Sequence, residues 1–260
     1  MKTAHSTKTA RGTTPPGAAN EQEAARWVQG MFGRIAPRYD LANHLLSLNI
    51  DRYWRMQTVR RVRHILRRPG TRALDLCCGT GDLLSALEAG RRGPVFGCDF
   101  CQPMLLAAQR KIAGQRMQSP LFEADALQLP LADASLDLIT VAFGFRNFVN
   151  YQRGLAEMHR VLRPSGMLAI LEFSQPSNSL FASLYNWYSR RVLPFIGGAL
   201  TGVKDAYRYL PESITKFPGV EDLAAQMRRA GFESVEFVRM TGGLVALHLG
   251  RESGNGRPET

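Results

Sequence analysis

The residues with the clearest potential for chemistry lie in the segment 72–82, which reads RALDLCCGTGD. Its apolar run 73–76 predicts a buried strand, and Gly79 and Gly81 predict a tight turn into a helix. Glycine lets the backbone come close to a ligand, and the start of a helix offers unpaired N–H groups. A strand, a glycine turn and a helix start in this order are typical of a nucleotide-binding corner.

Two ligands compete for this corner. The dinucleotide fingerprint requires a third glycine three residues after the second, and Leu84 at that position disfavours NAD and FAD. The other ligand is S-adenosylmethionine, because Asp75 at the strand end can hold the charged amino-acid end of that cofactor, directly or through water. An ordinary glycine-rich connection between a strand and a helix remains the alternative at this motif.

Two further acids follow the next predicted strands. Asp99 ends the strand 94–98, where an ionised carboxylate can accept hydrogen bonds from both ribose hydroxyls. Asp125 follows the strand 120–123 and is placed to meet the adenine amino group. Each acid alone could cap a helix or form a turn. Because ligands bind at the carboxyl ends of parallel strands, we expect these acids to gather with Asp75 around one cofactor.

The loop after the fourth predicted strand, 136–143, continues as Gly144-Phe145-Arg146-Asn147. Nucleic-acid N-methylating enzymes carry an Asn/Asp-Pro-Pro-aromatic tetrapeptide at this place. Enzymes that methylate the cytosine ring need a nucleophilic cysteine, usually after a proline. This chain has neither feature, so we expect no nucleic-acid partner.

The formal net charge of +11 is concentrated near the N-terminus. Residues 1–70 hold 13 Lys and Arg against 4 Asp and Glu, a net charge of +9, whereas residues 71–260 hold 20 against 18. Nucleic acid or an anionic membrane surface would explain this asymmetry. A solvated arginine-rich helix face with a loose tail would explain it equally well.

The four cysteines are Cys77, Cys78, Cys98 and Cys101. The spacing of the last two could suggest a metal or redox pair. A zinc site normally needs four ligands at finger-like spacings, so we expect no metal. We expect the cysteines at the ends of neighbouring strands, as small pocket-lining residues in a reducing cytoplasm.

Composition and periodicity divide the chain into four parts. Residues 1–22 are rich in Thr, Ala, Gly and Pro and predict a disordered basic tail. Residues 23–70 predict a helical N-terminal cap. Residues 71–251 alternate strands and helices, which predicts an α/β domain. Within this domain, the segment 176–215 predicts an aromatic-rich helical insertion that forms a wall for a hydrophobic substrate. Residues 252–260 form a C-terminal tail.

The sequence also predicts the structure near the C-terminus and the cellular location of the protein. Residues 234–240 and 244–249 predict a closing antiparallel hairpin. No stretch approaches 18 uninterrupted apolar residues, and residues 1–20 lack the apolar core of a secretory signal. We therefore expect a cytoplasmic protein.

With these motifs in place, the chain resembles the ubiquinone/menaquinone biosynthesis C-methyltransferase family over about residues 27–251. The glycine-turn motif is generic to methyltransferases, whereas the first and third matching segments are specific. Departures from the family pattern include Cys77 for a glycine, Ala142 for a serine and Asn49 for a glycine. The matching segments are 32–54, 74–82, 143–166 with 171–176, 207–219 and 242–250.

The resemblance implies a Rossmann-like class I fold with a seven-stranded, mainly parallel sheet that binds S-adenosylmethionine. It implies methyl transfer to a ring carbon of a polyprenylated hydroquinone, with demethylmenaquinol preferred. The same reaction on 2-polyprenyl-6-methoxy-1,4-benzoquinol and an RNA or small-molecule methyltransferase stay open as alternatives. Carried over by position, Thr80, Asp99, Asp125 and Ala126 would contact the cofactor.

A ring carbon is a poor nucleophile, so ionisation of the neighbouring phenolic hydroxyl and in-line alignment must drive the reaction. Arg146 can stabilise the phenolate, and Asn147 can position a water or the hydroxyl. Tyr39 can close over the methyl donor or share the proton transfer. The arginine-rich helix 51–68 can hold the chain peripherally against lipid head groups, and the sequence leaves an oligomer open.

Overall fold

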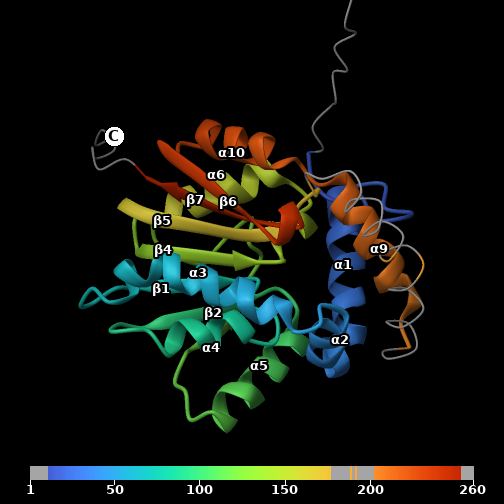
Figure 1. The fold of residues 1–260 in the computed structure, drawn as a ribbon, viewed down its shortest axis with the longest axis horizontal. Helices are drawn as coiled ribbons and strands as arrows, with labels where there is room; N and C mark the ends of the chain where they lie inside the picture. The colour runs from blue at the N-terminus through green and yellow to red at the C-terminus, as the bar shows by residue number, and fades with distance from the viewer. Residues whose placement is uncertain (1–10, 177–187, 189–190, 192–201, 253–260) are drawn as a thin grey trace, which may run out of the picture.

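The fold is one mixed sheet with helices on its two faces, and the computed structural model describes residues 11–176, 188, 191 and 202–252. Within these residues the strand order is β3-β2-β1-β4-β5-β7-β6 (Figure 1). The predicted seven-stranded sheet is therefore confirmed. The strands are β1 (Ala73–Leu76), β2 (Val95–Asp99), β3 (Leu121–Glu123), β4 (Leu136–Ala142), β5 (Leu162–Phe173), β6 (Ser234–Met240) and β7 (Val245–Arg251).

Strand direction determines where a ligand can bind. Strands β1 to β5 pair in parallel, whereas β7 is antiparallel to both β5 and β6, as the predicted hairpin requires. The strand order reverses between β1 and β4, and a crevice forms outside the carboxyl ends of strands at such a point. The larger helices are α1 (Glu21–Ile35), α2 (Tyr39–Leu46), α3 (Ile50–Leu66), α4 (Asp82–Glu88), α5 (Gln102–Gly114), α6 (Tyr151–Val161), α9 (Lys204–Lys216) and α10 (Val220–Arg229).

Apolar side chains on both faces explain why the central strands form. Leu74 and Leu76 of β1 belong to one buried cluster, which includes α6 and α10 residues. Ala73 of β1 and Leu138 of β4 belong to a second cluster, which includes α3 and α4 residues. Alternate residues of one strand thus face opposite layers, as the period of two demands.

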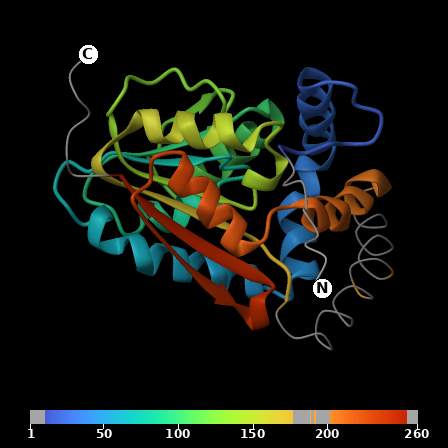
Figure 2. The same cartoon turned by 90° about the horizontal axis from the view of Figure 1, so that it is seen from above.

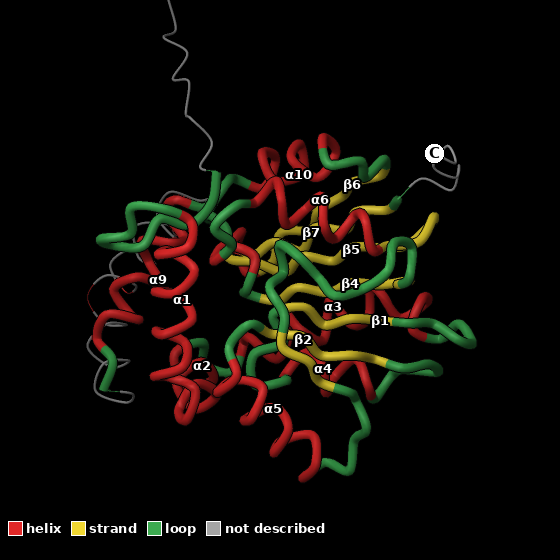
Figure 3. Tube along the Cα trace, turned by 180° about the vertical axis from the view of Figure 1, so that it is seen from behind, coloured by secondary structure: helices red, strands yellow, loops and turns green. Residues whose placement is uncertain are grey.

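The helices before β1 occupy two different places. Helix α3 lies along one face of the sheet, where Trp54, Val62 and Ile65 are buried (Figure 2). Helices α1 and α2 lie beyond the carboxyl ends of the strands, at the same end of the molecule as α9 (Figures 1 and 3). The segment 23–70 therefore supplies both a covering helix of the sheet and the helices nearest the crevice.

The N-terminal segment is ordered further than the sequence suggested. Helix α1 begins at Glu21, with Asn20 as its N-cap. Residues 11–20 are also described, which differs from the disorder expected over 1–22. The Thr13 N–H donates to the Phe148 carbonyl at 2.7 Å, and the Tyr151 N–H donates to the Arg11 carbonyl at 2.8 Å. These long-range backbone bonds stabilise a segment whose composition alone predicts a coil.

The predicted insertion 176–215 is described only in part. The aromatic residues expected at 177–187 and 192–201 lie outside the described residues. The described end of this segment is α9, which buries Tyr207 and Tyr209 near α1. No helix among the described residues has the length and apolar character needed to cross a membrane.

Candidate functional site

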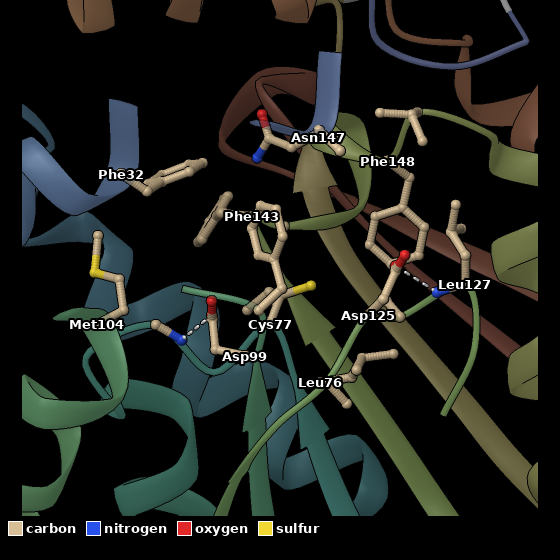
Figure 4. Close-up of a pocket in the computed structure, with 18 of the residues that line it drawn as sticks. Phe32, Leu76, Cys77, Asp99, Met104, Asp125, Leu127, Phe143, Asn147 and Phe148 are labelled. Atoms are coloured by element: carbon tan, nitrogen blue, oxygen red, sulfur yellow. Dashed lines mark hydrogen bonds between the residues drawn. The ribbon is translucent and has the colours of Figure 1, made fainter. Parts of the chain in front are cut away.

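A cavity opens at the carboxyl ends of β1, β2 and β4, where the strand order predicts a ligand (Figure 4). Its empty volume, counted together with the part that is open to solvent, is about 810 Å³. Most of its walls are apolar or aromatic. The polar or glycine positions around it include Gly79, Asp99, Asp125 and Asn147, all four of which were predicted as site residues.

Asp99 is fixed at the end of β2 by two backbone donors. The Gly79 N–H donates to Oδ2 and the Cys101 N–H donates to Oδ1, both at 2.9 Å. Burial raises the pKa of Asp99 to about 6, although these hydrogen bonds act in the opposite direction. Above that pH the carboxylate is ionised and faces the cavity, where it can accept hydrogen bonds from a ribose diol.

Asp125 and Ala126 line the far side of the same cavity. The Leu127 N–H donates to Asp125 Oδ1 at 2.9 Å, a local turn that fixes the carboxylate after β3 (Figure 4). Asp99 and Asp125 therefore face one cavity from two neighbouring strand ends. This geometry suits a ligand that carries a diol and an aromatic amine.

Asp75, Thr80 and Gly81 do not line the cavity. Asp75 is 1% exposed and accepts a hydrogen bond from Thr140 Oγ1 at 2.8 Å. Thr80 donates its hydroxyl hydrogen to Asp40 of α2. Gly81 has φ +88°, a conformation that favours glycine, and this shapes the turn. These three residues therefore stay predictions as cofactor contacts, since none of them lines the cavity.

A network of ion pairs joins α2 to the glycine turn. Lys111 Nζ lies 2.7 Å from Asp40 Oδ2 and 2.6 Å from Asp82 Oδ1. Arg55 of α3 pairs with Asp51 and lies 3.6 Å from Asp82 Oδ2. The network holds four helices, α2, α3, α4 and α5, together beside the cavity. Its members are up to 71 positions apart and no local motif links them, so the sequence alone does not predict it.

His44, Asp51 and Asp82 also come close enough to resemble a metal-binding group. Arg55 pairs with both carboxylates and Lys111 pairs with Asp82, so two positive charges already balance the two negative ones. The geometry therefore fits an ion-pair cluster better than a metal site. Among the cysteines, Cys77 lines the first cavity and the other three are buried. Burial raises the pKa of the Cys77 thiol well above its usual value, so this residue is a poor nucleophile at neutral pH.

A second, larger cavity adjoins the first and has an empty volume of about 1710 Å³. It is lined mainly by apolar and aromatic side chains of α1, α2, α3 and α9. Phe32, Tyr39 and Phe143 line both cavities. Phe143 has φ +59°, a strained conformation of the kind that is often found at functional sites. The two cavities therefore share one aromatic wall.

Arg146 is buried in the wall of the second cavity. Its Nη1 donates to Glu172 Oε1 at 2.8 Å, and its backbone N–H donates to Glu172 Oε2 at 3.2 Å. Burial acts to lower the pKa of Arg146, but Glu172 outweighs this effect and raises it. Nε is buried without a hydrogen-bond partner in the described part of the chain. Glu172 is not among the predicted site residues, although it lies in the matching segment 171–176.

Asn147 and Tyr39 lie at the first cavity, as the sequence predicted. Asn147 Oδ1 accepts a hydrogen bond from the Tyr209 hydroxyl at 3.0 Å. Burial raises the pKa of Tyr39, so its hydroxyl stays protonated at neutral pH and acts as a donor. Figure 4 shows Asn147, Phe32 and Phe143 around the same space.

The fold and this cavity define a class of protein. Solved structures with the same fold include a SAM-dependent methyltransferase from Thermotoga maritima, with a TM-score of 0.61, 18% identity and coverage of 86% of this chain and 99% of that one. The [4+2]-cyclase SpnF has a TM-score of 0.65 at 15% identity and covers 93% of this chain and 98% of its own. At these identities the likeness concerns the fold, which is that of class I S-adenosylmethionine-dependent methyltransferases.

The family follows from closer sequence matches. The model of the ubiE/COQ5 methyltransferase family matches residues 18–252, and the chain belongs to this family of SAM-dependent enzymes. The demethylmenaquinone methyltransferase of Thermus thermophilus is 48% identical over 85% of this chain and 99% of its own length. The ubiquinone/menaquinone biosynthesis C-methyltransferase of Ralstonia pickettii is 40% identical over 89% and 95%.

Replacement of Asp99 tests the cofactor cavity. We expect Asp99→Asn to weaken S-adenosylmethionine binding by about tenfold, the cost of a hydrogen bond to a charged group. Because burial raises the pKa of Asp99 to about 6, affinity of the native protein should rise as the pH increases through 6. Titration calorimetry measures both effects. The exposed Glu123 ends the next strand, and Glu123→Gln is the matched control; equal losses in the two variants would contradict the assignment.

The burial of Asp75 predicts a pH-dependent stability. Burial raises its pKa to about 7, whereas an unfolded aspartate titrates near about 3.9. The folded protein thus retains a proton that the unfolded chain releases, so stability falls as the pH rises from about 4 to 7. Between pH 5 and 8 the free energy of unfolding of the native protein should fall by about 2 kcal/mol because of this group, and Asp75→Asn should abolish that fall. Urea unfolding measures it, with the exposed Asp222→Asn as control; identical pH profiles would refute the prediction.

Proposed function

We propose that this methyltransferase transfers the methyl group of S-adenosylmethionine to a ring carbon of a polyprenylated hydroquinone, with demethylmenaquinol as the preferred acceptor and menaquinol as the product. Relatives from Thermus thermophilus and Deinococcus radiodurans, at 48% and 43% identity, are named demethylmenaquinone methyltransferases. The benzoquinol of ubiquinone biosynthesis is the second candidate, supported by the Ralstonia pickettii relative at 40% identity.

The observation that carries this proposal is the shared wall of the two cavities. A cofactor held by Asp99 and Asp125 occupies the first cavity, and a quinol ring enters from the larger apolar cavity beyond Phe32, Tyr39 and Phe143. The methyl donor and the ring carbon then meet at this wall. Such positioning supplies the alignment on which in-line transfer depends.

Arg146 is suited to the developing charge on the quinol. Its guanidinium lines the second cavity, and Glu172 holds it in place while Nε is left without a partner among the described residues. A buried N–H without a partner gains a hydrogen bond when a phenolate oxygen arrives. Tyr39 at the shared wall remains protonated and supplies a second donor. Together they stabilise the ionised quinol, which places electron density on the ring carbon.

A proton acceptor also lies beside the second cavity. Asp51 is the carboxylate among the described lining residues, and its Oδ2 lies 2.9 Å from His44 Nδ1. Burial acts to raise the pKa of Asp51, but Ser47, Arg55 and His44 outweigh it and lower the pKa. The carboxylate is therefore ionised at neutral pH. Because Asp51 itself lines the cavity, its carboxylate can take the phenolic proton, directly or through water.

A direct assay tests the function and the role of Arg146. The purified protein should convert reduced short-chain demethylmenaquinone to its methylated product with S-adenosylmethionine, as detected by mass spectrometry. Arg146→Lys keeps the charge opposite Glu172 but loses the planar fork, so kcat should fall about 100-fold with unchanged cofactor affinity. Arg163 on β5 is partly exposed and pairs with Asp137, and Arg163→Lys is the control.

Quinone extracts give the cellular counterpart of this assay. A strain that lacks the protein should accumulate demethylated menaquinone, and the native gene should restore the methylated form. An unchanged quinone profile would contradict the proposed acceptor. Accumulation of the benzoquinol precursor alone would favour the second candidate.

We further propose that the corner formed by α2, the turn 47–49 and the start of α3 contacts an anionic membrane surface. Exposed apolar side chains gather along this corner: Leu41, Leu45, Leu48, Ile50, Tyr53 and Met56. Leu48 and Ile50 also line the apolar cavity, so its rim and the corner are continuous. A prenyl tail can pass from a bilayer into the cavity at this rim.

Arginines extend the same face of α3. Tyr53, Met56, Arg60, Arg63 and Arg67 follow one another at intervals of three or four residues and are exposed, so they share one side of the helix. An apolar end and a basic end on one helix side match the acyl boundary and the anionic head groups of a membrane. The sequence predicted a membrane contact for the whole helix 51–68. The proposed contact is narrower, because it involves the corner and one side of α3.

Vesicle sedimentation tests the membrane corner. Leu48→Gln and Leu45→Gln together should reduce binding to vesicles that contain phosphatidylglycerol by about tenfold, because two apolar side chains no longer leave water. Leu106 on α5 is 49% exposed and belongs to neither α2, the turn 47–49 nor α3, so Leu106→Gln should bind like the native protein. Unchanged binding by the double variant would refute the proposal. Conversion of an oligomer to a monomer would assign the corner to a subunit interface instead.

A further inference from the structure

The N-terminal segment 11–13 lies against the loop that follows β4. Its backbone bonds to Phe148 and Tyr151 come directly after the residues of the predicted catalytic loop 144–147. A Cβ added at Gly12 would lie 1.9 Å from the Val149 carbonyl oxygen, so the two backbones are in direct contact. The family match starts at residue 18, so this contact lies outside the part of the chain that the family model covers.

Thr13 extends this contact to Asn147 through a chain of hydrogen bonds. Thr13 Oγ1 lies 2.6 Å from the Tyr209 hydroxyl oxygen, and the Tyr209 hydroxyl donates to Asn147 Oδ1 at 3.0 Å. Tyr209 has a single hydroxyl hydrogen, so in this arrangement Thr13 is the donor of the first bond. Both hydroxyl groups are on buried residues, and consecutive bonds of one direction strengthen each other.

The direction of the chain determines what Asn147 offers to a ligand. Its carboxamide oxygen is occupied by Tyr209, so the nitrogen is left as a donor. Figure 4 shows the nitrogen of Asn147 on the cavity side and the oxygen on the opposite side. Tyr209 also packs against Trp27 of α1, with ring centroids 5.0 Å apart, which holds its ring in place.

We propose that Thr13 and Tyr209 are positioning residues that fix Asn147 as a hydrogen-bond donor in the first cavity. The group that it meets is an oxygen acceptor, either the carboxylate of S-adenosylmethionine or the oxygen of the quinol. The segment before the family match thus takes part in the site. Only the quinol alternative depends on the proposed function, since cofactor binding can be measured without a quinol.

Matched hydroxyl variants test the chain. Thr13→Val removes the donor at nearly constant volume, Thr13→Ser retains it, and Thr14→Val changes the exposed neighbouring threonine. We expect Thr13→Val and Tyr209→Phe to lower kcat or cofactor affinity by about 3- to 10-fold, the cost of one buried hydrogen bond. Thr13→Ser and Thr14→Val should behave like the native protein. Thermal unfolding confirms that each variant is folded at the assay temperature.

The two acceptors are distinguished by calorimetry and kinetics. A weaker Kd for S-adenosylmethionine in the absence of quinol assigns the acceptor to the cofactor carboxylate. An unchanged Kd with a lower kcat assigns it to the quinol oxygen. A merely structural role of Thr13 would lower the unfolding temperature and leave both constants unchanged, and that result would overturn the proposal.

The donor role itself has a separate test at Asn147. Asn147→Asp keeps the shape and the acceptor for Tyr209 but replaces the donor nitrogen with an anionic oxygen. It should reduce kcat or the affinity for S-adenosylmethionine, whichever Thr13→Val lowers, at least tenfold more than Asn147→Ala does, because the new charge repels the ligand oxygen. Equal effects of Asn147→Asp and Asn147→Ala would overturn the assignment. A Thr13→Ser variant that differs from the native protein would overturn it as well.

Discussion

The hydrogen bond from the Gly79 N–H to Asp99 Oδ2 is the contact on which the proposed cofactor site depends. It joins the glycine turn after β1 to the end of β2, and the Cys101 N–H holds the other oxygen of the same carboxylate. One side chain thereby fixes two loops and presents its remaining lone pairs to the cavity. The low accessibility that raises its pKa also strengthens each hydrogen bond it makes with a ligand.

The sheet and its ligand-binding edge could be predicted because both follow from local pattern. Apolar runs identified the strands, the glycines identified the turn, and the carboxyl-end rule placed Asp99 and Asp125 at one cavity. The same rule did not determine the direction of a side chain. Asp75 is the penultimate residue of β1, and its carboxylate bonds to Thr140 in the interior and does not line the cavity.

Features that depend on distant partners cannot be predicted from local pattern. Thr80 is predicted at the cofactor, and in addition it bonds to Asp40, which is 40 positions away. Thr13 was assigned to a disordered tail and instead contacts Tyr209, 196 positions away. A single sequence shows residue types and spacing, whereas these pairs exist only after the chain has folded. Within the aromatic insertion 176–215, Tyr188 and part of α9 line the second cavity together with α1, α2 and α3.

In the proposed reaction, a sulfonium donor and a quinol ring meet across the wall of Phe32, Tyr39 and Phe143. A crystal structure with S-adenosylhomocysteine and a short-chain demethylmenaquinone would test this arrangement. We expect the adenosine ribose at Asp99 and the sulfur atom directed at the unsubstituted ring carbon, with room for one methyl group between them. A ring bound away from this wall, or a sulfur atom directed away from the ring, would contradict it.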